Sequence, residues 1–321
     1  MPAWLFGRGW ETSAEADLAR GSWPPLEWLA VFMHVLVTGA NGLLGSALVS
    51  QLAPHHDVLG LDLPELDITD RASVERAFEC AAPDVVIHCA AYTDVDRAES
   101  EPDLALLVNG QGAGLVAQCC EARGSHLIHI STDYVFSGEA GHAPFLPTDR
   151  PAPINAYGHS KLAGEVAVRE HCPAATIVRT CGLYGLRGRS FVAAILSRAL
   201  AGEPLKVVDD QTVGAPTYAV DLAQALATLA SLRPGGIVHL VNAGVCTWYE
   251  FAVEVLRAGG LAEHPIEPVP TDQFARPARR PAFSALASGA AHSAGLALRP
   301  YAEALHDFIP TWLAEWTRRA R

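Results

Sequence analysis

The chain has 321 residues, half of them apolar, and a formal net charge of −12. This length and apolar content suffice for a large buried core and fit one nucleotide-binding domain with a smaller partner domain. The excess of acidic residues would repel a phosphate backbone, so we expect no nucleic acid partner.

Cysteine and histidine are scattered along the chain. The seven cysteines form no CxxC pair, and the thirteen histidines show no spacing suited to zinc, so we predict no metal site. Thiols without a disulfide framework indicate reduced cysteines and a cytoplasmic location.

Residues 1–32 carry four tryptophans among glycines, prolines and charges, without a clear period. The segment lacks the basic start and continuous apolar run of a signal peptide, and the apolar stretch 29–38 is too short to span a bilayer. We therefore expect no membrane association. Two interpretations of this extension stay open: Met33 is the true start of the protein, or residues 1–32 pack on the surface in an ordered form.

From Met33 onward, short apolar runs alternate with amphipathic stretches, as a parallel sheet covered by helices requires. The pattern predicts strands over residues 35–38, 58–62, 84–89, 126–131 and 175–179. It predicts helices over residues 44–52, 74–80, 105–122 and 157–170. We therefore expect an α/β fold, with a Rossmann doubly wound parallel sheet over residues 33–180. Proline and glycine become frequent later, so residues 181–321 are expected to form mainly a smaller C-terminal substrate-binding domain, partly interleaved with the Rossmann domain.

A glycine-rich loop at residues 38–45 follows the first predicted strand and opens the first helix. Backbone N–H groups in this position can face a pyrophosphate at the positive end of the helix. Gly39 would allow the tight turn, Gly42 the close approach of phosphate, and Gly45 the packing of helix on strand. Asp62, at the end of the second strand, can accept hydrogen bonds from ribose hydroxyls, or it can cap a turn. A carboxylate there would repel a 2′-phosphate, which favours NADH, but neighbouring residues can compensate and the choice between NADH and NADPH stays open.

Tyr157 and Lys161 stand four residues apart and therefore share one face of a predicted helix. A free phenol loses its proton near about pH 10, and a neighbouring cation lowers that pKa. Tyr157 would then be the general acid that protonates a carbonyl oxygen as hydride arrives at carbon. Lys161 would also bond the nicotinamide ribose, and Thr132, at a strand end, would donate to the same carbonyl oxygen. A tyrosine and a lysine at this spacing are by themselves an ordinary surface pair; the glycine loop and the strand end favour catalysis.

Together these motifs resemble those of the extended short-chain dehydrogenase/reductases, and within them the dTDP-4-dehydrorhamnose reductase family. Further marks of the resemblance lie at residues 66–70, 89–96, 131–136, 157–165, 208–211, 216–217, 248–251 and 279–281. The resemblance implies an enzyme that uses NADPH or NADH to reduce the 4-keto group of a dTDP-linked 6-deoxyhexose, dTDP-4-dehydrorhamnose, to dTDP-L-rhamnose. It implies a nucleotide-sugar substrate and leaves a homodimer open.

The resemblance also completes the set of expected site residues. With the loop itself, the cofactor-binding set is Gly39, Asn41, Gly42, Leu43, Leu44, Gly45, Asp62, Asp67, Ile68, Ala90, Ala91, Tyr92, Tyr157 and Lys161. The substrate would meet Thr132, Asp133 and Arg280, because a guanidinium suits diphosphate oxygens. The alternative for the Arg279-Arg280 pair is a solvated charged loop.

Two departures from the family pattern concern the sugar pocket. After Thr180 the family usually places a small residue and a tryptophan that packs on the sugar, whereas this chain has Cys181 and Gly182. The spacing from Gln211 to Pro216 is one residue longer than in the rhamnose reductases. Two alternatives therefore stay open: a reductase of another nucleotide-linked keto sugar, and a non-catalytic cofactor-binding regulatory subunit, against which the intact tyrosine and lysine count.

Overall fold

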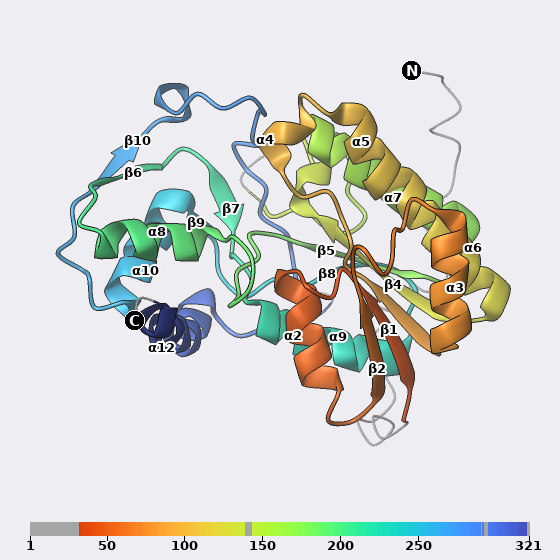
Figure 1. Cartoon of the computed structure of the whole chain (residues 1–321). Coiled ribbons are helices and arrows are strands. Elements are labelled where there is room, and N and C mark those ends of the chain that lie inside the picture. Colours follow the sequence, from red (N-terminus) through yellow and green to blue (C-terminus); the bar gives the residue numbers. More distant parts are fainter. Residues whose placement is uncertain (1–31, 139–142, 290, 292–294, 320–321) are drawn as a thin grey trace.

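The computed structural model describes residues 32–138, 143–289, 291 and 295–319 (Figure 1). Residues 1–31 lie outside the described residues, so both interpretations of the amino-terminal extension stay predictions. Among the described residues, none of the helices combines the length and apolar character that a membrane span needs.

A six-stranded parallel sheet forms the centre of the larger part of the molecule. In spatial order its strands are β2 (Asp57–Leu61), β1 (His34–Thr38), β3 (Val85–His88), β4 (His126–Thr132), β5 (Thr176–Thr180) and β8 (Gly236–His239). Every neighbouring pair is parallel. The chain winds outward in opposite directions from β1 and β3, which makes their carboxyl ends a topological switch point. The predicted α/β fold with a doubly wound parallel sheet is confirmed.

Helices cover both faces of this sheet (Figure 1). One face carries α2 (Leu43–Leu52) and α9 (Ala219–Leu232), and the other carries α3 (Arg71–Ala81), α6 (Ala113–Arg123) and α7 (Ala156–His171). Side chains alternate along a strand. Val35 and Val37 of β1 therefore pack with Leu48 and Leu226, whereas Leu36 between them packs with Phe78 on the opposite face.

The prediction of a single helix over residues 105–122 is wrong for the first part of that range. This stretch consists of α5 (Pro102–Leu106), a π-helical turn η3 (Leu107–Gly112) and then α6. The buried side chain of Asn109 in η3 donates to the backbone oxygen of Tyr92 (3.0 Å) and to the Ser160 hydroxyl (2.8 Å). π-helical turns often occur at functional sites.

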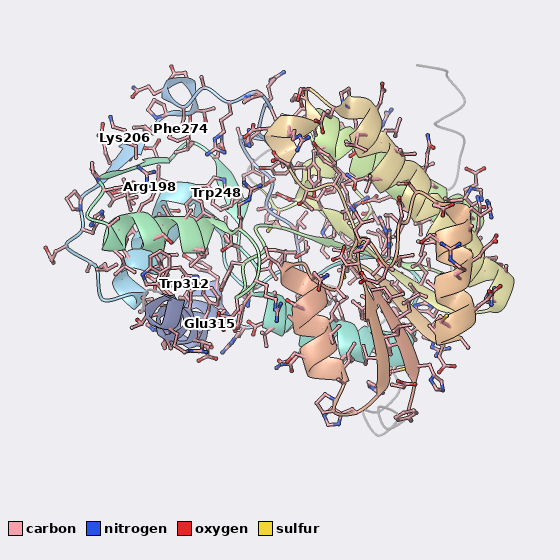
Figure 2. The ribbon with its side chains drawn as sticks, in the orientation of Figure 1. Arg198, Lys206, Trp248, Phe274, Trp312 and Glu315 are labelled. Atoms are coloured by element: carbon pink, nitrogen blue, oxygen red, sulfur yellow. The ribbon has the colours of Figure 1, made fainter. Side chains whose placement is uncertain are left out.

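The smaller part lies beside the carboxyl end of the sheet and has its own apolar core. It contains α8 (Phe191–Leu200), β6 (Leu205–Val208), β7 (Thr212–Gly214), β9 (Cys246–Thr247), α10 (Trp248–Ala258), β10 (Ile266–Val269) and α12 (Tyr301–Arg319). Strands β6 and β10 pair in parallel, and β7 and β9 pair antiparallel. Phe251, Phe308 and Trp312 belong to the core, and Figure 2 marks Trp248 and Trp312 in this part.

The larger part also contains segments from late in the chain. Strand β8 and helix α9 come after residue 180, yet they complete the sheet and its cover. The short segments α4 (Val95–Ala98), η4 (Asp133–Val135) and η5 (Thr271–Gln273) lie in the connections. The division into domains at residues 33–180 and 181–321 stays a prediction.

Candidate active site

A cleft of about 1190 Å³ is lined by residues from both parts of the molecule. Gly39, Cys89 and Cys181 each follow directly after a sheet strand and line it, as does Thr132 at the end of β4. The carboxyl ends of four parallel strands therefore form one wall. This is the position in which doubly wound sheets bind their ligands.

The glycine loop forms a backbone cradle in this wall. Gly39 has φ +68°, and a Cβ there would lie 2.6 Å from the backbone nitrogen of Ala90. A Cβ on Gly45 would lie 2.1 Å from the Gly39 oxygen, so only glycine fits either position. Gly42 precedes α2 without a side-chain cap, and Leu43 and Leu44 line the cleft beside it. Uncapped N–H groups at a helix start are a site for phosphate, so the cradle fits a cofactor diphosphate.

Asp62 lies next to this cradle and caps the turn: its two carboxylate oxygens accept from the backbone nitrogens of Asn41 (3.0 Å) and Leu63 (2.9 Å). The residue also lines the cleft, and its role toward a ribose stays a prediction. Asp67 and Ile68 also line the cleft. Hydrogen bonds from the Thr69 hydroxyl and backbone hold the pKa of Asp67 below its usual value.

Two expected cofactor residues lie apart from the cleft lining. Ala90 and Ala91 line the cleft, but Asn41 contributes its backbone bond to Asp62, and Tyr92 directs its hydroxyl to Glu101 (2.8 Å). The backbone nitrogen of Tyr92 donates to Asn109 (2.8 Å). No periodicity in the sequence signals this role of Asn109, because it depends on the π-helical turn.

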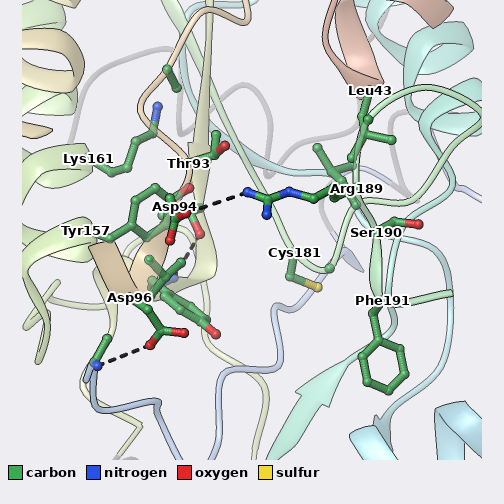
Figure 3. Close-up of a pocket in the computed structure, with 18 of the residues that line it drawn as sticks. Leu43, Thr93, Asp94, Asp96, Tyr157, Lys161, Cys181, Arg189, Ser190 and Phe191 are labelled. Atoms are coloured by element: carbon green, nitrogen blue, oxygen red, sulfur yellow. Dashed lines mark hydrogen bonds and ion pairs between the residues drawn. The ribbon is translucent and has the colours of Figure 1, made fainter. Parts of the chain in front are cut away.

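Helix α7 presents Tyr157 in its first turn. The side-chain oxygen of Asn155 accepts from the Gly158 nitrogen at 2.7 Å and caps the helix start. A Cβ on Gly158 would lie 2.2 Å from the backbone oxygen of Tyr134, so this glycine lets α7 press against η4. Figure 3 shows Tyr157 and Lys161 projecting from the same side of the cleft.

The phenol of Tyr157 has a raised pKa, which corrects the expectation that Lys161 lowers it. Burial raises the pKa of Tyr157 to about 12, while a hydrogen bond with Thr132 acts in the opposite direction and Asp133 adds to the rise. Lys161 is 3% exposed and donates to the Ile130 backbone oxygen at 2.6 Å. Burial lowers the pKa of Lys161 to about 8, and Glu165 counters that effect.

Asp133 is a second buried acid beside the phenol. Burial raises the pKa of Asp133 to about 6, although hydrogen bonds from Ser284 and Thr132 oppose the rise. The Thr132 hydroxyl donates to the Asp133 carboxylate at 2.9 Å. Thr132, Asp133 and Tyr157 thus form one connected polar group on the cleft wall.

Arg280 is not part of a solvated loop. Its guanidinium is 13% exposed and binds both oxygens of Asp96, at 2.5 and 2.9 Å. Both Arg280 and the exposed Arg279 line the cleft. The charge of Arg280 is therefore matched by Asp96, and its role toward a substrate stays a prediction.

Residues that sequence reasoning missed line the opposite wall. Arg189, before α8, lies 3.6 Å from Asp94 across the cleft (Figure 3). The rings of Phe191 and Trp248 are 4.6 Å apart and belong to the smaller part. No spacing in the sequence signals these pairs, because each joins segments far apart in the chain.

The two departures from the family pattern have clear structures. The Cys181 thiol donates to the backbone oxygens of Val213 and Ala215, both at 3.3 Å. Gly182 has φ +55°, and a Cβ there would lie 2.9 Å from the Pro216 side chain, so this backbone excludes any larger residue. The longer spacing before Pro216 coincides with a register shift in the β7–β9 pair.

Comparisons with known proteins agree with this geometry. Residues 33–313 match the family model described as the RmlD substrate binding domain. A dTDP-4-dehydrorhamnose reductase of Mycobacterium tuberculosis is 45% identical over 279 residues, covering 85% of this chain and 91% of the relative. A dTDP-4-keto-6-deoxy-D-glucose reductase of Streptomyces niveus is 40% identical, covering 86% and 96%.

A solved structure gives the same result at the level of the fold. The dTDP-4-dehydrorhamnose reductase of Bacillus anthracis, in complex with NADP, superposes with a TM-score of 0.82 at 38% identity, covering 88% of this chain and all of that one. The match extends over the sheet, the cradle and the smaller part, and the chain therefore belongs to the dTDP-4-dehydrorhamnose reductase family.

Proposed function

We propose that this protein uses NADPH or NADH to reduce the 4-keto group of dTDP-4-dehydrorhamnose, giving dTDP-L-rhamnose. The observation that carries the proposal is the meeting of Thr132, Tyr157 and Lys161 in a cleft that also holds the glycine cradle. The named activity of the M. tuberculosis relative and the NADP bound to the B. anthracis structure support it.

The proposed reaction assigns a role to Tyr157, Thr132 and Lys161. The nicotinamide cofactor supplies a hydride to the carbonyl carbon when it is bound. Because the pKa of Tyr157 is about 12, its phenol keeps its proton at neutral pH and can give it to the carbonyl oxygen. The Thr132 hydroxyl, hydrogen-bonded with the phenol, would turn its single proton from the Asp133 carboxylate to the same carbonyl oxygen. The Lys161 ammonium would hold the nicotinamide ribose and stabilise the phenolate that forms.

A second candidate function is the reduction of another nucleotide-linked keto sugar. Gly182 leaves the cleft wall without a large side chain, and the S. niveus relative is named for dTDP-4-keto-6-deoxy-D-glucose. An open wall at this position admits a sugar of different shape.

The test follows NADH and NADPH oxidation with each of these two dTDP-keto sugars. We expect turnover with dTDP-4-dehydrorhamnose, and a loss of at least about 100-fold in Tyr157→Phe, because general acid catalysis of this kind contributes about that much. Calorimetry with NADH and NADPH checks that this variant still binds a cofactor, so that the loss of turnover reports on the proton donor. Preference for the other sugar supports the second candidate, and cofactor binding without turnover on either supports a regulatory subunit.

We further propose a cytoplasmic location, and the homodimer that the resemblance left open stays open. The cytoplasmic location is supported by seven free thiols, five of them buried, which fit a reducing compartment.

A further inference from the structure

We propose that Glu165 is a positioning residue that keeps Lys161 charged and aligned in the active site. Tyr157, Lys161 and Glu165 follow each other along α7 at four-residue steps, and we call these three residues the row. Residues at this spacing lie one above the other on the same helix face. The catalytic consequence of this inference rests on the proposed function, whereas the charge effect on Lys161 does not.

Strand β4 holds all three members of the row. The Lys161 ammonium donates to the backbone oxygen of Ile130 at 2.6 Å. The hydroxyl of Ser131 donates to Glu165 at 2.5 Å, and that of Thr132 is hydrogen-bonded with Tyr157. Three consecutive strand residues therefore each contact one member of the row, so the same strand supports Glu165 and the two groups expected to take part in the reaction.

Glu165 is also tied to the next strand. Arg179 of β5 donates to both of its carboxylate oxygens, at 2.9 and 2.7 Å, and the two side chains are 0% and 3% exposed. The guanidinium also lies 5.0 Å from the centroid of the Phe136 ring. Replacing a buried ion pair with apolar groups of similar size often leaves stability unchanged, so stability alone does not account for this pair.

The groups around Lys161 show why a carboxylate is needed to keep its ammonium charged. The ammonium is buried among His88 of β3, His129 of β4 and the thiol of Cys89. Burial and Lys161 itself hold the pKa of both imidazoles well below the usual value, so they are neutral; burial keeps the thiol protonated by raising the pKa of Cys89 to about 12. The Tyr157 phenol is neutral as well. Among the described residues, Glu165 is thus the carboxylate that raises the pKa of the buried ammonium.

The experiment measures kcat/KM and the NADH dissociation constant from about pH 6 to about pH 10. This range extends from below the lowered pKa of Lys161 toward the ordinary pKa of lysine. In the wild type, kcat/KM should fall and the NADH dissociation constant should rise as Lys161 loses its proton near pH 8, which gives each pH profile an alkaline limb. In Glu165→Gln, we expect this alkaline limb to move down by about one pH unit in both measurements, because the substitution removes the negative charge that raises the pKa of Lys161. If the wild type binds NADH but turns over no keto sugar, the proposed function fails while the binding limb still tests Glu165.

Two further variants separate the charge effect from folding. Glu165→Gln leaves the Arg179 guanidinium buried without its partner, so Glu165→Leu combined with Arg179→Met removes the pair as a unit, and we expect a smaller downward shift of the limb. Asp221→Asn breaks another ion pair, with Arg299 at 2.9 Å, outside the cleft lining and should lower stability without moving the limb. An unmoved limb in the double variant, which would assign any shift in Glu165→Gln to the unpaired Arg179, or an equal shift in Asp221→Asn, would overturn the proposal.

Discussion

The phenol of Tyr157 is subject to opposing electrostatic effects. Burial and the carboxylate of Asp133 raise its pKa, and the hydrogen bond with Thr132 lowers it, with burial dominating. The pKa of about 12 keeps the phenol protonated over the physiological range. Lys161, with a pKa of about 8, loses its proton first as pH rises. The alkaline limit of activity therefore belongs to the ammonium, while the phenol stays a proton donor.

Gly182 is the residue at which backbone conformation decides the shape of the cleft. We expect Gly182→Ala to lower the free energy of unfolding by about 2–5 kcal/mol, since a left-handed conformation costs about 1–2 kcal/mol and overpacking adds about 1–3. The new Cβ would lie 2.9 Å from the Pro216 side chain. Urea midpoints with unchanged slopes measure the loss.

The matched control is Gly202→Ala. Gly202 has φ +74°, like Gly182 in the left-handed region, but nothing lies within 4 Å of its Cβ position. This variant should cost only the conformational strain of about 1–2 kcal/mol. Equal losses in the two variants would show that Pro216 gives way and that the contact does not restrict residue 182.

At the scale of elements, the start of α7 links stability to activity. We expect Asn155→Ala to cost about 1–3 kcal/mol, because the buried side chain caps the helix by accepting from Gly158 and also donates to the Arg279 backbone oxygen. Tyr157 lies in the same first turn, so a frayed start should also lower kcat by about tenfold or more, as small misplacements of reacting groups do. Chemical denaturation and steady-state kinetics on the same samples measure both effects.

Asp70→Ala provides the comparison for this cap. Asp70 caps α3 by accepting from the nitrogens of Ala72 and Ser73 and does not itself line the cleft, although Thr69 beside it does. Its loss should cost about 1 kcal/mol, the share of a helix cap alone, and leave kcat unchanged. If both variants lose activity equally, global destabilisation rather than the position of Tyr157 is the cause.

The elements also show which features a sequence can predict. The strand expected at 58–62 lies at Asp57–Leu61, and the helix expected at 157–170 lies at Ala156–His171, because local apolar patterns and caps define both. The π-helical turn at Asn109 and the pairing of β8 with β5 depend on contacts between distant segments, and the local pattern carries no trace of them. The order of the motifs led us to expect Thr132 beside Tyr157. It did not reveal the pairing of Glu165 with Arg179, because that pair also joins distant segments.

For the whole molecule, histidines buried in the sheet couple folding to pH. His88, His126 and His239 have pKa values lowered by burial to about 3, 4 and 3, and burial holds that of His129 well below its usual value. An unfolded chain binds these protons near about pH 6.5, so below that pH it binds more protons than the folded protein, and stability falls. Asp133, with its raised pKa of about 6, has the opposite effect on acidification, but it is one group against four. The contribution of these histidines should therefore be fully present above about pH 6.5 and be lost as pH falls toward about 4.

His239→Leu tests this coupling. His239 is buried beside the Phe136 ring, with centroids 6.1 Å apart, and the Arg179 guanidinium adds to burial in lowering its pKa. Leucine keeps the packing on the ring and removes the titrating group. Between about pH 6 and 5 the variant should lose stability less steeply than the wild type, by up to about 1.4 kcal/mol per pH unit, because one fewer proton binds on unfolding. Val238→Ala removes buried methyl groups without removing a titrating group, and it should lower the urea midpoint equally at every pH. If the pH slope of His239→Leu equals that of the wild type, His239 is already protonated in the folded protein, and the buried sheet does not exclude its charge.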